Sequence, residues 1–419
     1  MSPAMKTSTL TLVFLSAANA FTSTQSVFLQ QSKLAYSPLI QQTPHSQRTS
    51  SSAIQAKLGE RDRTIPLPDF SKVGDAVSGN NKQKKTGRPD SPPPAPFLNK
   101  RLFAQLIVSQ LTIFGFAYFQ TGGATLATLL QNSHFDSPTA IALGVAAALP
   151  LIGLNRVVEE SDAEELASIN LSTDLLAYSL FGKNTQPAFA LFVSAVMCTI
   201  TGVVEETVFR GQVMPNVFLG LAANGWVTSP HTGIAAAAVL SSVLFAAGHL
   251  NIGGGFRYLV SPEARALFTL QFFNGLTFAT LFGLTGDLTA PIVAHALYDL
   301  SALYGTHMRV TKQLSYAEEQ AGGRPKTPMD AARRAFYLMD RNKDGFVSPR
   351  ELRIGLYSFG IFAPTGFSDK VFKKVDRDGD GLIDAKEFEK TLQSSVGPNQ
   401  SAEEAATNTI KRSILGVQM

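Results

Sequence analysis

The sequence predicts an all-α protein in which a polytopic bundle of transmembrane helices is followed by a smaller soluble helical lobe. Hydrophobic residues make up 45% of the 419 positions and the mean hydropathy is +0.08, which is too apolar for an ordinary soluble protein. Charge is also unevenly distributed. Residues 186–256 contain only three charged side chains, whereas residues 311–419 contain 17 Lys or Arg and 15 Asp or Glu. We therefore expect the first region in a bilayer and the second in water.

The first 59 residues contain no Asp or Glu and are rich in hydroxyl side chains, a composition typical of targeting segments. Residues 1–20 resemble a signal peptide, with Lys6 before a short apolar stretch and a small-x-small cleavage site ending at Ala20. Residues 21–57 resemble a transit peptide, and the two together resemble the bipartite presequences of algae with complex plastids. We expect a plastid membrane, thylakoid or inner envelope. The alternative is a plain secretory signal and a secretory-pathway membrane.

A basic, proline-rich linker is expected over residues 58–100, because this stretch has little to bury. Its positive cluster flanks the first predicted span, which places the mature N-terminus on the cytoplasm-equivalent side of the membrane. The net charge is only +4 and the chain has no long basic run. A nucleic-acid partner is therefore not expected.

Residues 101–310 have the hydropathy of a membrane bundle, since a span needs about 17 to 25 mostly apolar residues. The lipid bilayer is the partner that this pattern implies, with six to eight spans. The candidate spans are 102–120, 139–155, 187–204, 207–222, 232–249, 264–284 and 288–305.

Three groups of ionisable residues lie within or beside these apolar spans, where a charge costs about 2.5 to 3.5 kcal/mol on insertion scales. Such residues usually face a polar interior and are functional. Arg210 follows Glu206 by one helical turn, and Asp299 follows His295 by the same spacing, so each pair shares a helix face. The candidate site residues are Glu205, Glu206, Arg210, His249, His295 and Asp299.

Written as patterns, these residues form EExxxR, FxxxH and HxxxD, in that order along the chain. This set resembles the motifs of the CPBP family, which contains the CAAX proteases of the Ras-converting type and bacteriocin-processing enzymes. The resemblance covers residues 100–310 and implies an intramembrane peptidase with a peptide substrate, prenylated or not. It implies that Glu205 and His249 activate the attacking water. It also implies that Glu206 and Arg210 support them.

For His295 and Asp299 the resemblance implies stabilisation of the oxyanion that forms during peptide hydrolysis. The best-understood prenyl proteases have Asn where this chain has Asp299, so Asp299 can orient His295 instead. Two other functions remain open. Glu205, His249 and His295 could bind zinc in a metallopeptidase, although no HExxH is present. Alternatively, the protein could be a non-catalytic, calcium-responsive membrane scaffold.

Two segments in the charged C-terminal region match the pattern D-x-[DN]-x-[DN]-G-x5-E and resemble the calcium loops of an EF-hand pair over 328–395. Oxygen ligands at fixed loop positions would bind two calcium ions, and Val347 and Ile383 are expected to pair between the loops. A linker is expected over 311–327 and a disordered tail over 396–419. The expected calcium ligands are Asp340, Asn342, Asp344, Phe346, Ser348 and Glu351 in the first loop and Asp376, Asp378, Asp380, Leu382, Asp384 and Glu387 in the second.

Overall fold

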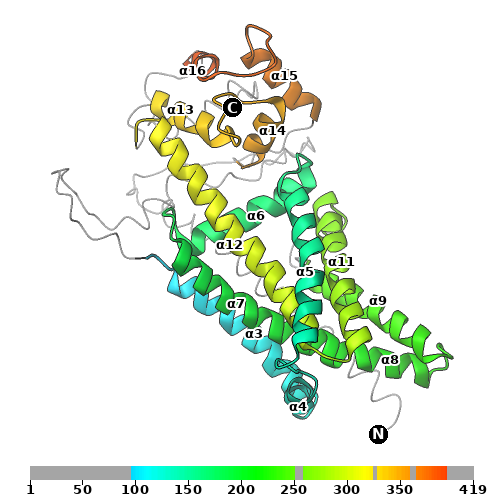
Figure 1. Cartoon of the computed structure of the whole chain (residues 1–419). Helices are drawn as coiled ribbons and strands as arrows, with labels where there is room; N and C mark the ends of the chain where they lie inside the picture. Colours follow the sequence, from blue (N-terminus) through cyan, green and yellow to red (C-terminus); the bar gives the residue numbers. More distant parts are fainter. Residues whose placement is uncertain (1–95, 251–257, 324–327, 359–364, 394–419) are drawn as a thin grey trace, which may run out of the picture.

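The computed structural model describes residues 96–250, 258–323, 328–358 and 365–393, and this part of the chain is helical, as predicted (Figure 1). It contains no strand, but an isolated antiparallel bridge joins Val347 to Ile383, which confirms the expected pairing between the two loops. The signal and transit segments, the linker before residue 96 and the tail from residue 394 lie outside the described residues. The predictions for them therefore stay predictions.

The bundle and the lobe are consecutive in the chain and lie one above the other in Figure 1. The bundle contains α3 (Lys100–Gln120), α4 (Ala124–Gln131), α5 (Pro138–Glu159), α6 (Glu164–Phe181), α7 (Pro187–Val208), η1 (Phe209–Val213), α8 (Met214–Ala223), α9 (Pro230–Gly248), α11 (Pro262–Thr285) and α12 (Thr289–Gln320). The lobe contains α13 (Pro328–Met339), α14 (Pro349–Ser358), α15 (Thr365–Val375) and α16 (Ala385–Gln393).

Five of the described helical segments are long and apolar enough to cross a membrane. They are Lys100–Gln120, Pro138–Glu159, Pro187–Ala223, Pro230–Gly248 and Pro262–Thr285. The predicted spans 187–204 and 207–222 therefore belong to one continuous segment, in which η1 is a π-helical turn between α7 and α8. The predicted span 288–305 lies in α12. This helix is not among the five, because polar residues such as His295 and Asp299 lower its apolar character. It lies between α5, α7 and α11 (Figure 1).

Three of the spanning helices begin with the dipeptide Ser-Pro. In each one the serine hydroxyl accepts a hydrogen bond of 3.2 Å from the backbone N–H three residues later, and the proline occupies the first helical turn. Serine suits the cap because it satisfies an unpaired N–H, and proline suits the next position because its fixed φ is helical. The three pairs are Ser137-Pro138, Ser229-Pro230 and Ser261-Pro262.

Glycines on two helices let α12 approach its neighbours closely. A Cβ at Gly144 of α5 would lie 2.6 Å from the carbonyl oxygen of Ala290. A Cβ at Gly202 of α7 would lie 3.1 Å from the carbonyl oxygen of Ile292. Small residues at such contacts are typical of helix packing in membranes. They fix the first turns of α12, where His295 lies.

The lobe has a separate apolar core, in which the aliphatic pair Val347 and Ile383 lies between the helices. The linker expected over 311–327 differs from the structure, because α12 continues as a helix to Gln320 and its last turns pack on α13. The buried core residues are Ala332, Ala335, Phe336, Met339, Val347, Leu352, Leu356, Val371, Phe372, Val375, Ile383 and Phe388.

Candidate active site

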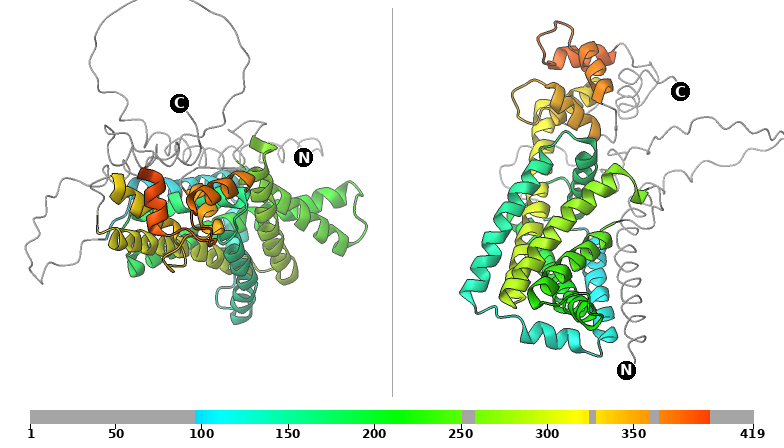
Figure 2. Two further views of the ribbon diagram at one scale, coloured as in Figure 1. Left: turned by 90° about the horizontal axis from the view of Figure 1, so that it is seen from above. Right: turned by 90° about the vertical axis from the view of Figure 1, so that its right-hand side faces the viewer.

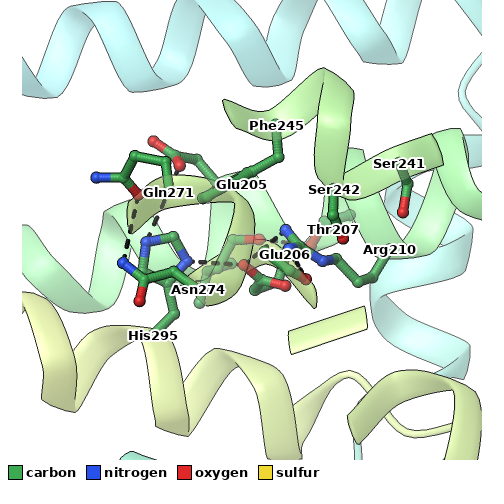
Figure 3. A network of polar contacts seen from close by, with 12 residues as sticks. Glu205, Glu206, Thr207, Arg210, Ser241, Ser242, Phe245, Gln271, Asn274 and His295 are labelled. Carbon is green, nitrogen blue, oxygen red and sulfur yellow. Dashed lines mark hydrogen bonds and ion pairs between the residues drawn. The ribbon is translucent and has the colours of Figure 1, made fainter. Parts of the chain in front are cut away.

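Residues from α7, η1, α9, α11 and α12 meet inside the bundle (Figure 3). Glu205 and Glu206 end α7, Arg210 lies in the π-helical turn η1, and His295 projects from the second turn of α12. The two glutamates, the arginine and His295 are buried, with at most 4% of each residue exposed. π-Helical turns are frequent at functional sites, and here the turn follows directly after the two glutamates.

Glu206 Oε1 contacts both Arg210 and His295 and so connects the residues of this network. Arg210 Nη1 donates to Glu206 Oε1 at 3.1 Å, and His295 Nδ1 lies 2.7 Å from the same oxygen. Because a carboxylate can only accept, the His295 proton that faces it is on Nδ1. Glu206 therefore fixes the orientation of His295 and turns its Nε2 toward the other carboxylates.

Arg210 also contacts uncharged groups, namely a backbone carbonyl and two aromatic rings. Its Nη2 donates to the backbone carbonyl of Gly275 at 2.7 Å, and its guanidinium carbon lies 4.6 Å from the centre of the Phe245 ring and 5.4 Å from that of Phe278. A Cβ at Gly275 would lie 3.3 Å from Nη2, so a glycine is needed for this close approach. The aromatic rings and the carbonyl therefore stabilise the guanidinium charge together with Glu206.

Among the described residues, only one of the two carboxylate oxygens of Glu205 accepts a hydrogen bond. Gln110 of α3 donates from Nε2 to Glu205 Oε1 at 3.0 Å. Glu205 Oε2 is buried and has no hydrogen-bond partner among the described residues, and it lies 4.0 Å from His295 Nε2. A buried carboxylate oxygen without a donor is costly, which indicates that this atom faces a water or a substrate group during function.

His295 also contacts Asp299, one helical turn further along α12. Its Nε2 lies 3.4 Å from Asp299 Oδ2, and the imidazole stacks on the Phe278 ring at 4.8 Å with an angle of 15°. Asp299 is 30% exposed, whereas the histidine is buried. Asp299 therefore lies at the boundary between the buried network and a more open space.

His249 follows the end of α9 and packs on the same aromatic residue as Arg210. Its Nδ1 lies 2.8 Å from the carbonyl oxygen of Phe245, and the two rings are 4.6 Å apart. A carbonyl only accepts, so Nδ1 carries the proton and Nε2 of a neutral His249 is a proton acceptor. Residues 251–257, which follow it, lie outside the described residues.

A cavity of about 280 Å³ opens beside the network, between α3, α6, α7 and α12. Gln110 and Asp299 supply polar atoms to its wall, which is otherwise mainly apolar and includes Leu106, Met197 and Leu303. An apolar cavity with a few polar groups at one side is typical of ligand sites. Gln110, which donates to Glu205, and Asp299, which contacts His295, thus border a space large enough for a peptide side chain.

Sequence reasoning missed several residues of the network because they lie outside the three motifs. Gln110 contacts Glu205 from 95 positions away, and Gln271 and Asn274 project from α11 toward His295 (Figure 3). Asn274 Nδ2 lies 3.4 Å from Gln271 Oε1. Each of these residues is an amide in the middle of an apolar helix. That feature could have identified them in the sequence, because polar residues within membrane spans are often functional.

The zinc alternative can be compared with the positions of the ligand atoms. Within the described ranges, the His, Cys, Asp and Glu residues whose ligand atoms gather within 4.8 Å of one another are Asp376, Asp378 and Asp380. Glu205, His249 and His295 do not form such a group there. The structure therefore gathers metal ligands in the lobe rather than at the candidate active site.

The two loops of the lobe have the same local structure. Loop positions 4 and 6 have positive φ in both, with 64° at Lys343, 88° at Gly345, 76° at Gly379 and 85° at Gly381. Each loop also ends in a reciprocal cap. Ser348 and Glu351, and likewise Asp384 and Glu387, exchange hydrogen bonds between side chain and backbone. The glutamates at position 12 are thereby turned into their loops.

The residues of the first loop fit a calcium ion. Asp340 is fully buried, and its Oδ1 has no hydrogen-bond partner among the described residues. The side chains of Asn342 and Asp344 lie next to it in the loop, and carboxylate and amide oxygens are the ligands that calcium prefers. In the second loop the three aspartates supply the corresponding oxygens.

Comparison with known proteins gives two matches. Residues 187–301, which include all six candidate site residues, match the family described as Type II CAAX prenyl endopeptidase Rce1-like. Residues 329–393 match the EF-hand domain pair. The chain thus joins a segment that matches the Rce1-like CAAX protease family to a segment that matches the EF-hand pair. Together with the five apolar helical segments, this makes it an integral membrane protein with a calcium-binding lobe.

Curated relatives match the C-terminal part of the chain. The probable calcium-binding protein CML28 of Oryza sativa subsp. japonica is 37% identical over 65 residues, which is 16% of this chain and 38% of that protein. Calmodulin-like protein 2 of Arabidopsis thaliana is 41% identical over 63 residues, 15% of this chain and 41% of its own length. The chain thus spans about two fifths of the length of these relatives. No solved structure matches the chain.

Proposed function

We propose that the Rce1-like domain is an intramembrane endopeptidase in which Glu205 is the general base that activates a water molecule. The observation that carries this proposal is the position of Glu205 Oε2, buried and without a hydrogen-bond partner among the described residues, 4.0 Å from His295 Nε2. Gln110 holds the other carboxylate oxygen, so the unpartnered one has a defined direction. A carboxylate held in this way can take a proton from water in the transition state.

The neighbouring residues then have distinct roles in the proposed reaction. Water attacks the peptide carbonyl carbon, Glu205 takes its proton, and that proton passes to the nitrogen of the departing amine when the C–N bond breaks. His249, with its acceptor Nε2, assists the proton transfer. His295, which faces Glu206 with Nδ1 and Asp299 with Nε2, acts as an imidazolium with a proton on each nitrogen, and it donates from Nε2 to the oxyanion while Asp299 aligns it. Glu206 and Arg210 act through His295.

Hydrolysis by the purified full-length protein tests this function. A labelled prenyl-CAAX peptide, its unprenylated form and a plastid membrane proteome are incubated with the protein, and products are identified by mass spectrometry. We expect cleavage that o-phenanthroline leaves unchanged. Loss of cleavage in the chelator, together with stoichiometric zinc in the protein, would support the metallopeptidase instead. No product from any of the three substrates would favour the non-catalytic scaffold.

We also propose that the lobe binds two calcium ions, one in each loop. Calorimetry of the full-length protein in detergent is expected to show two sites with dissociation constants of about 0.1 to 10 µM, the range of sensor hands. Glu351→Gln and Glu387→Gln each remove a position-12 carboxylate and are expected to remove one site each. The double variant is expected to bind no calcium in this range. Two sites in either single variant would contradict the assigned ligands.

A further inference from the structure

The first hand of the lobe is in direct contact with the last turns of α12 (Figure 1). Gln313 Nε2 donates to the backbone carbonyls of Tyr337 and Asp340, at 2.7 Å each, where α13 ends. The last carbonyls of a helix lack partners within the helix, so an external donor satisfies them. A residue of α12 thus caps the helix that leads into the first calcium loop.

Tyr316 extends this contact into the loop itself. Its hydroxyl donates to Asp340 Oδ2 at 2.9 Å, and the Gly345 N–H donates to the same oxygen at 3.2 Å. Asp340 Oδ1, by contrast, is the buried oxygen without a hydrogen-bond partner among the described residues, so it is the one left to bind calcium.

In the part of the chain that the structure describes, the first aspartate of the second loop accepts its hydrogen bonds from that loop. Asp376 accepts from the N–H groups of Gly379, at 2.8 Å, and Gly381, at 3.2 Å, which both belong to its own loop. Asp376 is also partly exposed, whereas Asp340 is fully buried. The two hands therefore share one backbone structure but differ in what surrounds their first ligand.

Both helices of the first hand are tied to the bundle, and they are tied to different parts of it. On α13, Arg334 forms an ion pair of 3.1 Å with Glu318 of α12. On α14, Arg353 forms an ion pair of 2.7 Å with Asp162, in the connection between α5 and α6. A change in the angle between α13 and α14 must therefore act on α12 and on this connection at the same time.

We propose that the first calcium site is shared between the lobe and the bundle, with Tyr316 as a positioning residue for Asp340 and α12 as the element that links calcium to the protease domain. Residues that hydrogen-bond a metal ligand orient it, and their loss typically weakens metal binding about 10- to 100-fold. Tyr316 has this relation to Asp340. The second site has no such residue among those that the structure describes, and it is independent of α12.

The link reaches the candidate active site because α12 is one continuous helix. It carries Gln313 and Tyr316 near its end and His295 and Asp299 near its beginning. At a rise of 1.5 Å per residue, about 26 Å separate Asp299 from Tyr316 along the axis. By thermodynamic linkage, calcium at the first hand and the position of α12 must influence each other equally. The effect on catalysis rests on the proposed function, whereas the effect on calcium affinity does not.

Calcium titration of full-length variants tests the proposal one hand at a time. In the Glu387→Gln background, which isolates the first hand, Tyr316→Phe is expected to raise the calcium dissociation constant about 10-fold. In the Glu351→Gln background, which isolates the second hand, the same substitution is expected to change nothing. Tyr337→Phe, which removes the hydroxyl of the ring packed on Tyr316, is the matched control in both backgrounds.

Hydrogen exchange of residues 307–320 gives a second measurement that needs no peptidase activity. Calcium is expected to slow this exchange in Glu387→Gln, and Tyr316→Phe is expected to shift the effect to higher calcium. The proposal would be overturned if Tyr316→Phe left the calcium affinity of the first hand unchanged or weakened both hands equally. It would also be overturned if calcium did not change the hydrogen exchange of α12. If no substrate is cleaved but these shifts occur, the proposed function fails and the shared calcium site stands.

Discussion

Replacing Glu205 with glutamine is expected to lower peptide cleavage by about 100- to 10,000-fold, the contribution typical of a general base. Glutamine has the same shape and can still bind Gln110 through its amide oxygen, so the packing around α3 and α7 is preserved. It cannot take a proton from water at the position of Oε2. The loss should therefore appear in kcat, with the thermal unfolding temperature unchanged.

The rate of product formation by the purified variant, measured by mass spectrometry, checks this expectation. Glu319→Gln is the matched control, because Glu319 is an exposed glutamate on α12 and its replacement removes the same charge outside the network. A Glu205→Gln protein with wild-type kcat would exclude Glu205 as the base. An equal loss in Glu319→Gln would show that the effect comes from net charge.

The largest expected effect on stability follows from Arg210. Arg210 and Glu206 are both 0% exposed, and removing the arginine takes away the permanent positive charge beside a buried carboxylate, which keeps only its contact with His295. Arg210→Met is therefore expected to lower the free energy of unfolding by about 3 to 5 kcal/mol. Methionine fills much of the space between Phe245 and Phe278, so loss of charge pairing dominates over loss of packing.

A double-mutant cycle separates charge pairing from packing. The variant Glu206→Gln with Arg210→Met has no unpaired charge in the pair, so it is expected to be more stable than Arg210→Met alone. Unfolding in detergent, followed by circular dichroism, measures each corner of the cycle. Strictly additive losses, with no recovery in the double variant, would show that the two side chains contribute independently.

The sequence predicted best the features whose determinants are close together in the chain. The two calcium loops follow from ligand types at fixed positions within twelve residues, so even the pairing of Val347 with Ile383 could be expected. The apolar helices follow from hydropathy. The length of α12 could not be predicted from hydropathy, because its last turns are polar. These turns contact the lobe through residues such as Gln313 and Tyr316.

The candidate site shows the same limit. Glu206 and Arg210 share a helix face, so their proximity is a matter of spacing. The carbonyl of Gly275, the amide of Gln110 and the ring of Phe278 come from other helices, and only tertiary packing brings them to the network. A single sequence contains no record of which helices are neighbours. These three contacts therefore required the structure.

The start of α3 also indicates on which side of the membrane we expect the calcium loops to lie. The N–H of Asn99 donates to the carbonyl of Leu180, at the end of α6, and the beginning of α6 lies near Asp162, which contacts the lobe. Figures 1 and 2 show α4, which follows α3, at the end of the bundle away from the lobe, so α3 begins on the side nearer to the lobe. Lys100 and Arg101 open α3, and such basic flanks stay on the side from which a protein is inserted. We therefore expect the calcium loops to meet the solution on the side of the membrane from which the protein is inserted.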